Sequence, residues 1–528
     1  DLALLGSFCK RRWLASNTES ESDLENAYDN YMECRSMNGG YWCTINAAAL
    51  ALYLNKKELS VELADEVISE CWEEYNRHGT NAEYWIPASM GEAYLIKGDY
   101  GSAARWYKSS RSHLRNRMGQ IRTTRTNSEM IMKMLDPPAE EADRIRTSIK
   151  KPRIAIFAGH RIDDPERPRP RFPGHISGRV KKRLKKELIR LKLDIGVASA
   201  ADGSDIIFHE CLQETGKRTH VILPAPVDHF RENLLESRGK RWAERFDRVI
   251  RGSARIEITS SARFSWHNSA LYKLSSDYML EYAIDICEAF DADPVPIVVW
   301  DRNPSPNPGG TGYIVNCFRS RGLSPKRIPI DDLVDKKGAM ISGRKKKTDF
   351  PYREKGIFEP DLKPIVAISI LDDWMPEENI ASALNKVART ASAIIHDKSC
   401  RTVTAGTAAC GIFLLMDNTE DSLDFCRELA ERSQDLPAFS MVLHCGIATM
   451  LETSLTGRRD YYCREVKEAL ETACSLKEHA VVSTMQFRSA CSGSFDEENR
   501  FRYSGRFMTS GGNLLKLFRL ETGKNSYM

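Results

Sequence analysis

The sequence lacks a long apolar run, an excess of one charge and any paired cysteine motif. No apolar stretch approaches the roughly 20 residues of a transmembrane helix, which argues against a membrane span. The net charge is only +4, from 77 basic and 73 acidic residues, so no global field attracts polyanions. The 14 cysteines form no CxxC pair, and several lie in apolar runs such as "VLHCGI". We therefore expect a cytoplasmic protein with reduced cysteines, without a disulfide framework or a zinc site.

The length bounds the number of domains. At 528 residues the chain exceeds one ordinary core, and about 150 residues per domain predicts three or four units. The opening "DLALLGSFCKRRW" has no Met and places its basic residues after the apolar part, the reverse of a secretory signal. We expect the chain to start within a helical repeat, as a fragment or a processed form.

Residues 1–135 show helical periodicity. The piece "YWIPASMGEAYLIKGDYGSAARWYKSS" predicts two helices joined by a Gly-Asp turn. Small and aromatic residues occupy its tetratricopeptide positions: Gly91, Ala93, Tyr94, Gly98, Tyr100, Ala103 and Tyr107. The segment "YWCTINAAALALYL" also resembles the TRAFs-binding region of apoptosis signal-regulating kinases, which implies a protein partner. The simpler alternative is that the stacked helices only bury one another.

Residues 136–150, with two prolines and a charge run, are expected to form a linker. In residues 151–335, short apolar runs such as "RIAIFAGHR" and "THVILPAP" alternate with helical patterns such as "VKKRLKKELIRLK". This alternation predicts a Rossmann-like, doubly wound and mainly parallel sheet.

Three loops of this region follow predicted strands, and ligands of open parallel sheets bind at those ends. Their glycines allow close approach of the backbone, and a helix N-terminus offers free N–H groups to an anion. Gly309, Gly310, Thr311 and Gly312 thus form a candidate phosphate cradle.

The motifs "AGHR", "DGSDIIFHE" and "GGTG" resemble those of the SLOG superfamily, which includes the LOG phosphoribohydrolases and DprA-like proteins. The resemblance implies a nucleotide or nucleotide-derived ligand. It implies that the ligand-binding residues are Gly159, His160, Arg161, Gly203, Ser204, Asp205, Glu210, Asp301, Gly309, Gly310, Thr311 and Gly312. The full "PGGxGT…E" signature is absent, which favours sensing over hydrolysis. A hydrolase with Glu210 or Asp301 as acid or base stays an alternative. Individually, Asp205 could cap a helix, the glycines could serve turns, and His160 could be structural.

The basic stretches "RPRPRF", "KKRLKK" and "GRKKK" raise the question of nucleic acid binding. The lysines of the second stretch lie opposite the apolar stripe of their helix, the usual solvated face. Because no aromatic residues interleave for base stacking, nucleic acid is not the expected partner.

After a basic linker at residues 336–362, residues 363–525 alternate strands and helices around the hairpin "CRTVTAGTAACGIFLLM". With "LHCGI", "YYCREVKEALETA" and "YSGRF", this order resembles the class III adenylate/guanylate cyclase domain. The resemblance implies a ferredoxin-like α/β sandwich and a homodimer.

Cyclization needs two metal ions, and the cyclase family holds them with two carboxylates. The resemblance places one carboxylate on the first strand, near Ile368 and Ser369, and the other at the hairpin tip, where this chain has Thr407. The family's Asn and Arg fall at about Lys467 and Glu471. Asp372 and Asp373 could supply one metal ligand. We expect no bound metal and no catalytic residues here.

The sequence thus predicts a regulatory protein. Helical repeats would recruit a partner, the second region would sense a nucleotide-derived ligand, and an inactive cyclase-type region would relay the signal or dimerise. The alternatives are an active nucleotide cyclase, a nucleotide hydrolase and a scaffold whose pockets are unused.

Overall fold

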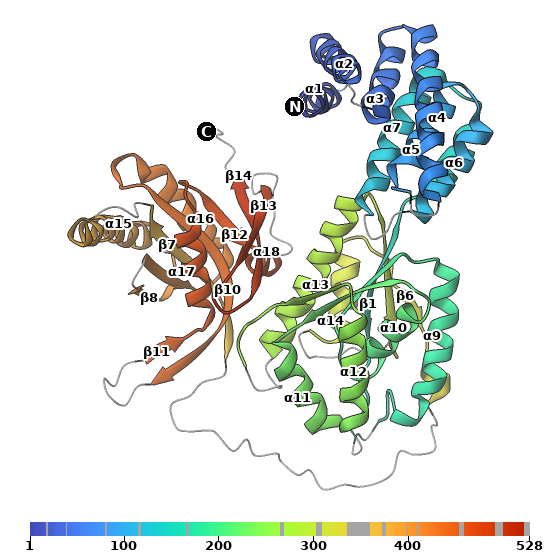
Figure 1. The fold of residues 1–528 in the computed structure, drawn as a ribbon. Coiled ribbons are helices and arrows are strands. Elements are labelled where there is room, and N and C mark those ends of the chain that lie inside the picture. The colour runs from blue at the N-terminus through green and yellow to red at the C-terminus, as the bar shows by residue number, and fades with distance from the viewer. Residues whose placement is uncertain are drawn as a thin grey trace. The chain divides into compact units, whose positions relative to one another are not determined.

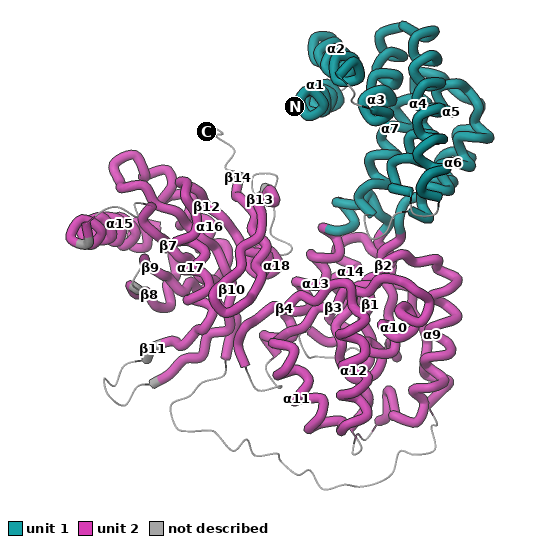
Figure 2. The backbone as a smooth tube through the Cα atoms, viewed as in Figure 1, with its two compact units in different colours: residues 1–152, 286–293 teal, residues 153–285, 294–528 magenta. Residues whose placement is uncertain are grey.

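A computed structural model describes most of the chain: residues 1–16, 19–37, 40–79, 82–113, 118–164, 167, 169–263, 269–302, 309–334, 360–371, 376–398, 400–408, 411–452, 459–491 and 500–521. It forms two compact units (Figure 2). Unit 1 comprises residues 1–152 and 286–293, and unit 2 comprises residues 153–285 and 294–528. Among the described residues, no helix is both long enough and apolar enough to cross a bilayer.

Unit 1 is helical, as the periodicity predicted (Figure 1). Its helices are α1 (Leu2–Ala15), α2 (Glu21–Ser36), α3 (Gly40–Tyr53), α4 (Lys57–His78), α5 (Trp85–Ile96), α6 (Tyr100–Ser112), α7 (Gly119–Leu135) and α8 (Ala139–Ser148). Consecutive helices from α1 to α6 pack on each other, α7 packs on α5 and α8 packs on α6; Trp13 and Tyr107 are fully buried. Close packing requires Gly91, because a Cβ there would lie 2.5 Å from the ring of Tyr107.

Two expectations for this unit were wrong. Cys34, near the end of α2, and Cys43, near the start of α3, form a disulfide, since the tight α2–α3 connection brings their Cα atoms to 6.2 Å. The expected linker at residues 136–150 contains α8. Its two prolines end α7 but precede α8, where Pro138 is the N-cap residue and Glu140 and Glu141 favour the positive end of the helix.

The first part of unit 2 is a parallel-sheet region. Its six strands have the order β4-β3-β2-β1-β5-β6. The strands are β1 (Arg153–Gly159), β2 (Ile195–Ala198), β3 (Arg218–Leu223), β4 (Arg255–Ile258), β5 (Asp293–Val299) and β6 (Lys326–Ile328). The helices are α9 (Ser177–Leu191), α10 (Ser204–Gln213), α11 (Val227–Arg238), α12 (Lys240–Gly252), α13 (Ser269–Phe290) and α14 (Thr311–Ser320). The strand order reverses between β1 and β5, which opens a crevice at their carboxyl ends.

The second part of unit 2 is a mixed-sheet region. Its sheet has the order β13-β14-β12-β10-β7-β9-β8, and β11 pairs with β10. The strands are β7 (Asp361–Ile370), β8 (Thr402–Ala408), β9 (Gly411–Met416), β10 (Phe439–Glu452), β11 (Arg459–Tyr462), β12 (Val481–Thr484), β13 (Arg500–Met508) and β14 (Leu514–Glu521). The helices are α15 (Glu377–Asp397), α16 (Thr419–Glu431), α17 (Glu465–Ser475) and α18 (Met485–Ala490). Among the registers described for this mixed sheet, only the β10–β12 pair is parallel.

The predicted hairpin forms, but its tip was misplaced. Gly406 and Thr407 lie within β8 and pair with Phe413 and Ile412 of β9. The pairing continues to Ala408, which lies opposite Gly411. Residues 409–410, which join the strands, lie outside the described residues.

Candidate ligand-binding site

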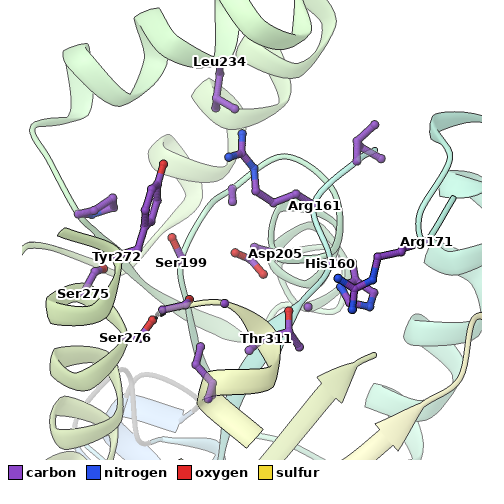
Figure 3. Close-up of a pocket in the computed structure, with 18 of the residues that line it drawn as sticks. His160, Arg161, Arg171, Ser199, Asp205, Leu234, Tyr272, Ser275, Ser276 and Thr311 are labelled. Carbon is purple, nitrogen blue, oxygen red and sulfur yellow. Dashed lines mark hydrogen bonds between the residues drawn. The ribbon is translucent and has the colours of Figure 1, made fainter. Parts of the chain in front are cut away.

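A cavity of about 550 Å³ lies at the carboxyl ends of β1, β2 and β5, in the size range of small-molecule sites. Figure 3 shows several of its side chains. Of the predicted residues, those lining it are Gly159, His160, Arg161, Asp205, Gly309, Gly310, Thr311 and Gly312. Those that the sequence interpretation missed include Arg171, Ser199, Arg238, Tyr272, Ser275 and Ser276.

The loops after β1 and β2 form one wall, joined at a β-bridge between Arg161 and Gly203. Gly203 has a φ of 104°, and a Cβ there would lie 2.7 Å from the carbonyl oxygen of His160. The backbone N–H of Ser204 donates to that same carbonyl (3.0 Å). Gly203 thus serves the turn between the two loops and does not itself line the cavity.

A buried carboxylate, Asp202, orients two arginines beside the cavity. Arg161 Nε donates to Asp202 Oδ1 (2.8 Å), and Arg238 Nε donates to Asp202 Oδ2 (2.7 Å). Arg238 also donates to Asp164 (2.7 Å). The Asp202 side chain is fully buried, whereas that of Arg161 is 42% exposed. The guanidinium of Arg161 therefore keeps an accessible edge that can meet an anionic ligand.

Asp301 lies just after β5 and holds two cavity residues in place. Arg171 donates to both oxygens of its carboxylate, at 2.7 and 2.8 Å. Nε2 of His160 lies 3.0 Å from Asp301 Oδ1 and accepts a hydrogen bond from the Asp301 backbone N–H (3.1 Å). Asp301 does not itself line the cavity, so its observed role is to position Arg171 and His160.

One oxygen of the Asp205 carboxyl, Oδ1, lacks a hydrogen-bond partner among the described residues, although backbone hydrogen bonds from Ala201 and Gly159 reach the carboxyl group and act to lower its pKa. The Asp205 side chain is buried at the start of α10. Burial raises the pKa of Asp205 to about 7, and the nearby Asp202 carboxylate adds to the increase. In the close-up, Asp205 points into the cavity opposite Tyr272 (Figure 3). A buried oxygen without a partner is costly unless a ligand or water satisfies it.

The opposite wall is the start of α14. Gly310 is its N-cap residue, and Thr311 and Gly312 begin the helix, so free backbone N–H groups face the cavity. Gly309 has a φ of 80°, and a Cβ there would meet the Tyr272 backbone at 2.5 Å. Ser276 Oγ donates to the Gly309 carbonyl (3.1 Å), which fixes this turn against α13.

Besides Gly203 and Asp301, two further predicted residues lie outside the cavity lining. Glu210 is held by Arg245 at 2.7 and 2.8 Å and by Lys181 at 3.0 Å. These cations lower its pKa against the opposing effect of burial, which is the largest single influence. Ser204 is buried beneath Gly159, whose Cβ would lie 2.4 Å from that of Ser204. Neither residue lines the cavity.

Where the cyclase resemblance places the two metal-binding carboxylates, the mixed-sheet region has Ile368, Ser369 and Thr407 instead. Ile368 is fully buried, and the buried Ser369 lies 3.3 Å from Cys474 Sγ. Lys467 is exposed, and Glu471 accepts hydrogen bonds from Ser510 at 2.6 and 3.0 Å. Asp372 and Asp373 lie outside the described residues. Within the described ranges, no three His, Cys, Asp or Glu side chains are arranged to hold a metal ion.

Comparisons with known proteins match different parts of this architecture. The family model of TPR-S, Tetratricopeptide Repeats-Sensor, matches residues 2–51. No curated protein matches the chain.

Solved structures similar to about a third of the chain include nucleotide cyclases. Adenylyl cyclase CyaB from P. aeruginosa is 13% identical, with 32% of this chain and 100% of that chain covered and a TM-score of 0.25. A Trypanosoma brucei adenylate cyclase is 13% identical, with 32% of this chain and 91% of that chain covered and a TM-score of 0.27. An adenylate/guanylate cyclase/hydrolase from Silicibacter pomeroyi is 14% identical, with 31% of this chain and 97% of that chain covered and a TM-score of 0.26.

Proposed function

We propose that this chain is a cytoplasmic regulatory protein that binds a nucleotide or nucleotide-derived ligand in the cavity of its parallel-sheet region. Asp205 carries this proposal, because it lines the same cavity as the N-terminus of α14 and its Oδ1 atom has no hydrogen-bond partner among the described residues. A phosphate would meet the N–H groups of Gly310, Thr311 and Gly312, with Arg161 as its counter-charge. Asp205 would then bond to a hydroxyl or amino group of the ligand.

The other regions would turn binding into a signal. The helical unit, whose start matches the TPR-S family, would recruit a protein partner. The mixed-sheet region would relay the signal or form a homodimer without cyclization, since Ser369 and Thr407 cannot replace anionic metal ligands. A hydrolase that uses Glu210 is disfavoured because Arg245 and Lys181 already hold that carboxylate outside the cavity.

Calorimetric titration of the full chain with nucleoside mono-, di- and triphosphates, cyclic nucleotides and NAD tests the proposal. We expect at least one to bind, and Asp205→Asn to change its affinity by about tenfold, the effect of one buried hydrogen bond. Asp332→Asn is the matched control, because Asp332 pairs with Arg183 on an exposed surface outside the cavity. Failure of the whole panel to bind would contradict the proposal.

A further inference from the structure

Helix α13 contributes a continuous face to the cavity. Tyr272, Ser275, Ser276 and Met279 recur at spacings of three and four residues and all line it. Figure 3 shows the first three side chains on one helix at the cavity wall. Ser276 also binds the Gly309 turn at the start of α14. Any ligand that fills the cavity must therefore touch α13.

Later residues of the same helix contact the mixed-sheet region within unit 2. Arg488 of α18 donates to Asp285 (2.8 Å) and lies 3.9 Å from Glu281. Glu281 is also bound by Arg321 (2.6 Å), so its orientation is fixed from both sides. Lys516 of β14 places its ammonium 4.1 Å from the centre of the Tyr282 ring. These charged contacts are largely buried, and such groups resist displacement from their partners.

A second connection runs from the segment after β4. Ser260 Oγ donates to the Glu465 carboxylate at the start of α17, and both side chains are buried. On the same helix, Glu468 is bound by Asn513 (2.6 Å). Helix α17 is the element to which the cyclase resemblance assigns the ribose and phosphate contacts. The parallel-sheet region thus contacts α17, the helix that carries two of the positions named by the cyclase resemblance, Lys467 and Glu471.

We propose that α13 transmits occupancy of the cavity to α18 and, through β10, on which both helices pack, to α17, so that ligand binding changes the exposed surface of the mixed-sheet region. This inference rests on the proposed function, because the occupant is the nucleotide-derived ligand. A helix moves as a rigid element, so a shift at Tyr272 and Ser276 reaches Asp285. Linkage requires that the effect be reciprocal: loosening the α18 contact must alter affinity at the cavity.

Hydrogen–deuterium exchange of the full chain tests the coupling without a ligand. Ser275→Phe fills the cavity, and Ser320→Phe on the exposed end of α14 makes the same change away from it. We expect Ser275→Phe, but not Ser320→Phe, to change amide exchange in α17 and α18 at least threefold. Arg488→Ala should abolish that response. If Ser275→Phe lowers the melting temperature strongly, Ser275→Leu replaces it with a smaller side chain.

Exchange that changes in α13 and α14 alone would overturn the coupling. A second arm uses the nucleotide that binds best in calorimetry: Arg488→Ala should alter its affinity several-fold, although Arg488 lies outside the cavity. Unchanged affinity would also overturn the coupling. If no nucleotide binds, the proposed function fails, while the Ser275→Phe arm still decides the coupling on its own.

Discussion

At the scale of residues, Asp205 is the group whose environment most needs a ligand. Its pKa of about 7 means that the folded protein holds a proton between pH 4 and 7 that the unfolded chain releases. Stability therefore falls as the pH rises through this range. Above pH 7 the buried carboxylate lowers the free energy of unfolding by up to about 4 kcal/mol, from the size of the pKa shift. Asp205→Asn removes this loss of stability.

Calorimetric melting at pH 5 and pH 8 checks this prediction. Because the amide does not titrate, Asp205→Asn should be more stable than the unsubstituted protein at pH 8, and the difference should shrink to less than half of that value at pH 5. Asp332→Asn should behave oppositely, since Arg183 lowers the Asp332 pKa to about 2 and the carboxylate is favourable at pH 8. An Asp205→Asn curve parallel to that of the unsubstituted protein would show that Asp205 is ionised in the folded state.

The sequence identified Asp205 but not the residues that make it unusual. In "AADGSD", Asp202 and Asp205 are three residues apart, and nothing in that string says which one two arginines neutralise. Arg238 and Tyr272 come from helices far along the chain, so only the fold could bring them to the cavity. Arg171 lies in "RPRPRF", whose charge pattern raised the question of nucleic acid binding and gave no sign of a partner for Asp301.

At the scale of elements, the packing of α5 on α6 depends on one glycine. In Gly91→Ala the new methyl group would overlap the Tyr107 ring, which is fully buried and has no room to move. We expect a loss of about 1–3 kcal/mol in the stability of unit 1, as in other overpacked cores. Gly101→Ala in α6 is the control, because its Cβ meets nothing closer than 3.7 Å and alanine favours the helix.

Thermal unfolding followed by circular dichroism at 222 nm checks this pair of variants. The melting temperature should fall for Gly91→Ala and should hold or rise for Gly101→Ala. Equal shifts in both variants would show that Tyr107 does not restrict the position of Gly91.

Hydrophobic periodicity predicted the elements better than their ends. The buried runs of β1 and β3 and the apolar stripe of α9 were visible because each repeats with the period of its structure. The hairpin turn was misplaced because a glycine can lie within a strand as well as in a turn. Helix α8 was missed because two prolines marked a break without showing that a helix restarts after them.

At the scale of the whole molecule, the order of a helical, a parallel-sheet and a mixed-sheet part was predictable from the alternation of patterns. The division into units was not, because residues 286–293 at the end of α13 join the helical unit. Asp291 there accepts hydrogen bonds from Arg125 (3.1 Å) and Lys151 (2.6 Å). Contacts between residues more than a hundred positions apart leave no local signal in the sequence.

We predict that the mixed-sheet region has no nucleotide cyclase activity. Incubation of the full chain with ATP or GTP and Mn²⁺ should yield no cyclic nucleotide above that of a no-protein control, because Ser369 and Thr407 offer no anionic oxygen to a hard cation. Product that is abolished by Asp372→Ala would contradict this prediction and favour an active cyclase.

The most direct measurement is a crystal structure of the full chain with the nucleotide that binds most tightly. We predict electron density for the phosphate of that nucleotide at Gly310 and Thr311, and a hydrogen bond between the nucleotide and Asp205. Density beside Thr407 with a pair of metal ions, and an empty cavity at Asp205, would contradict this prediction.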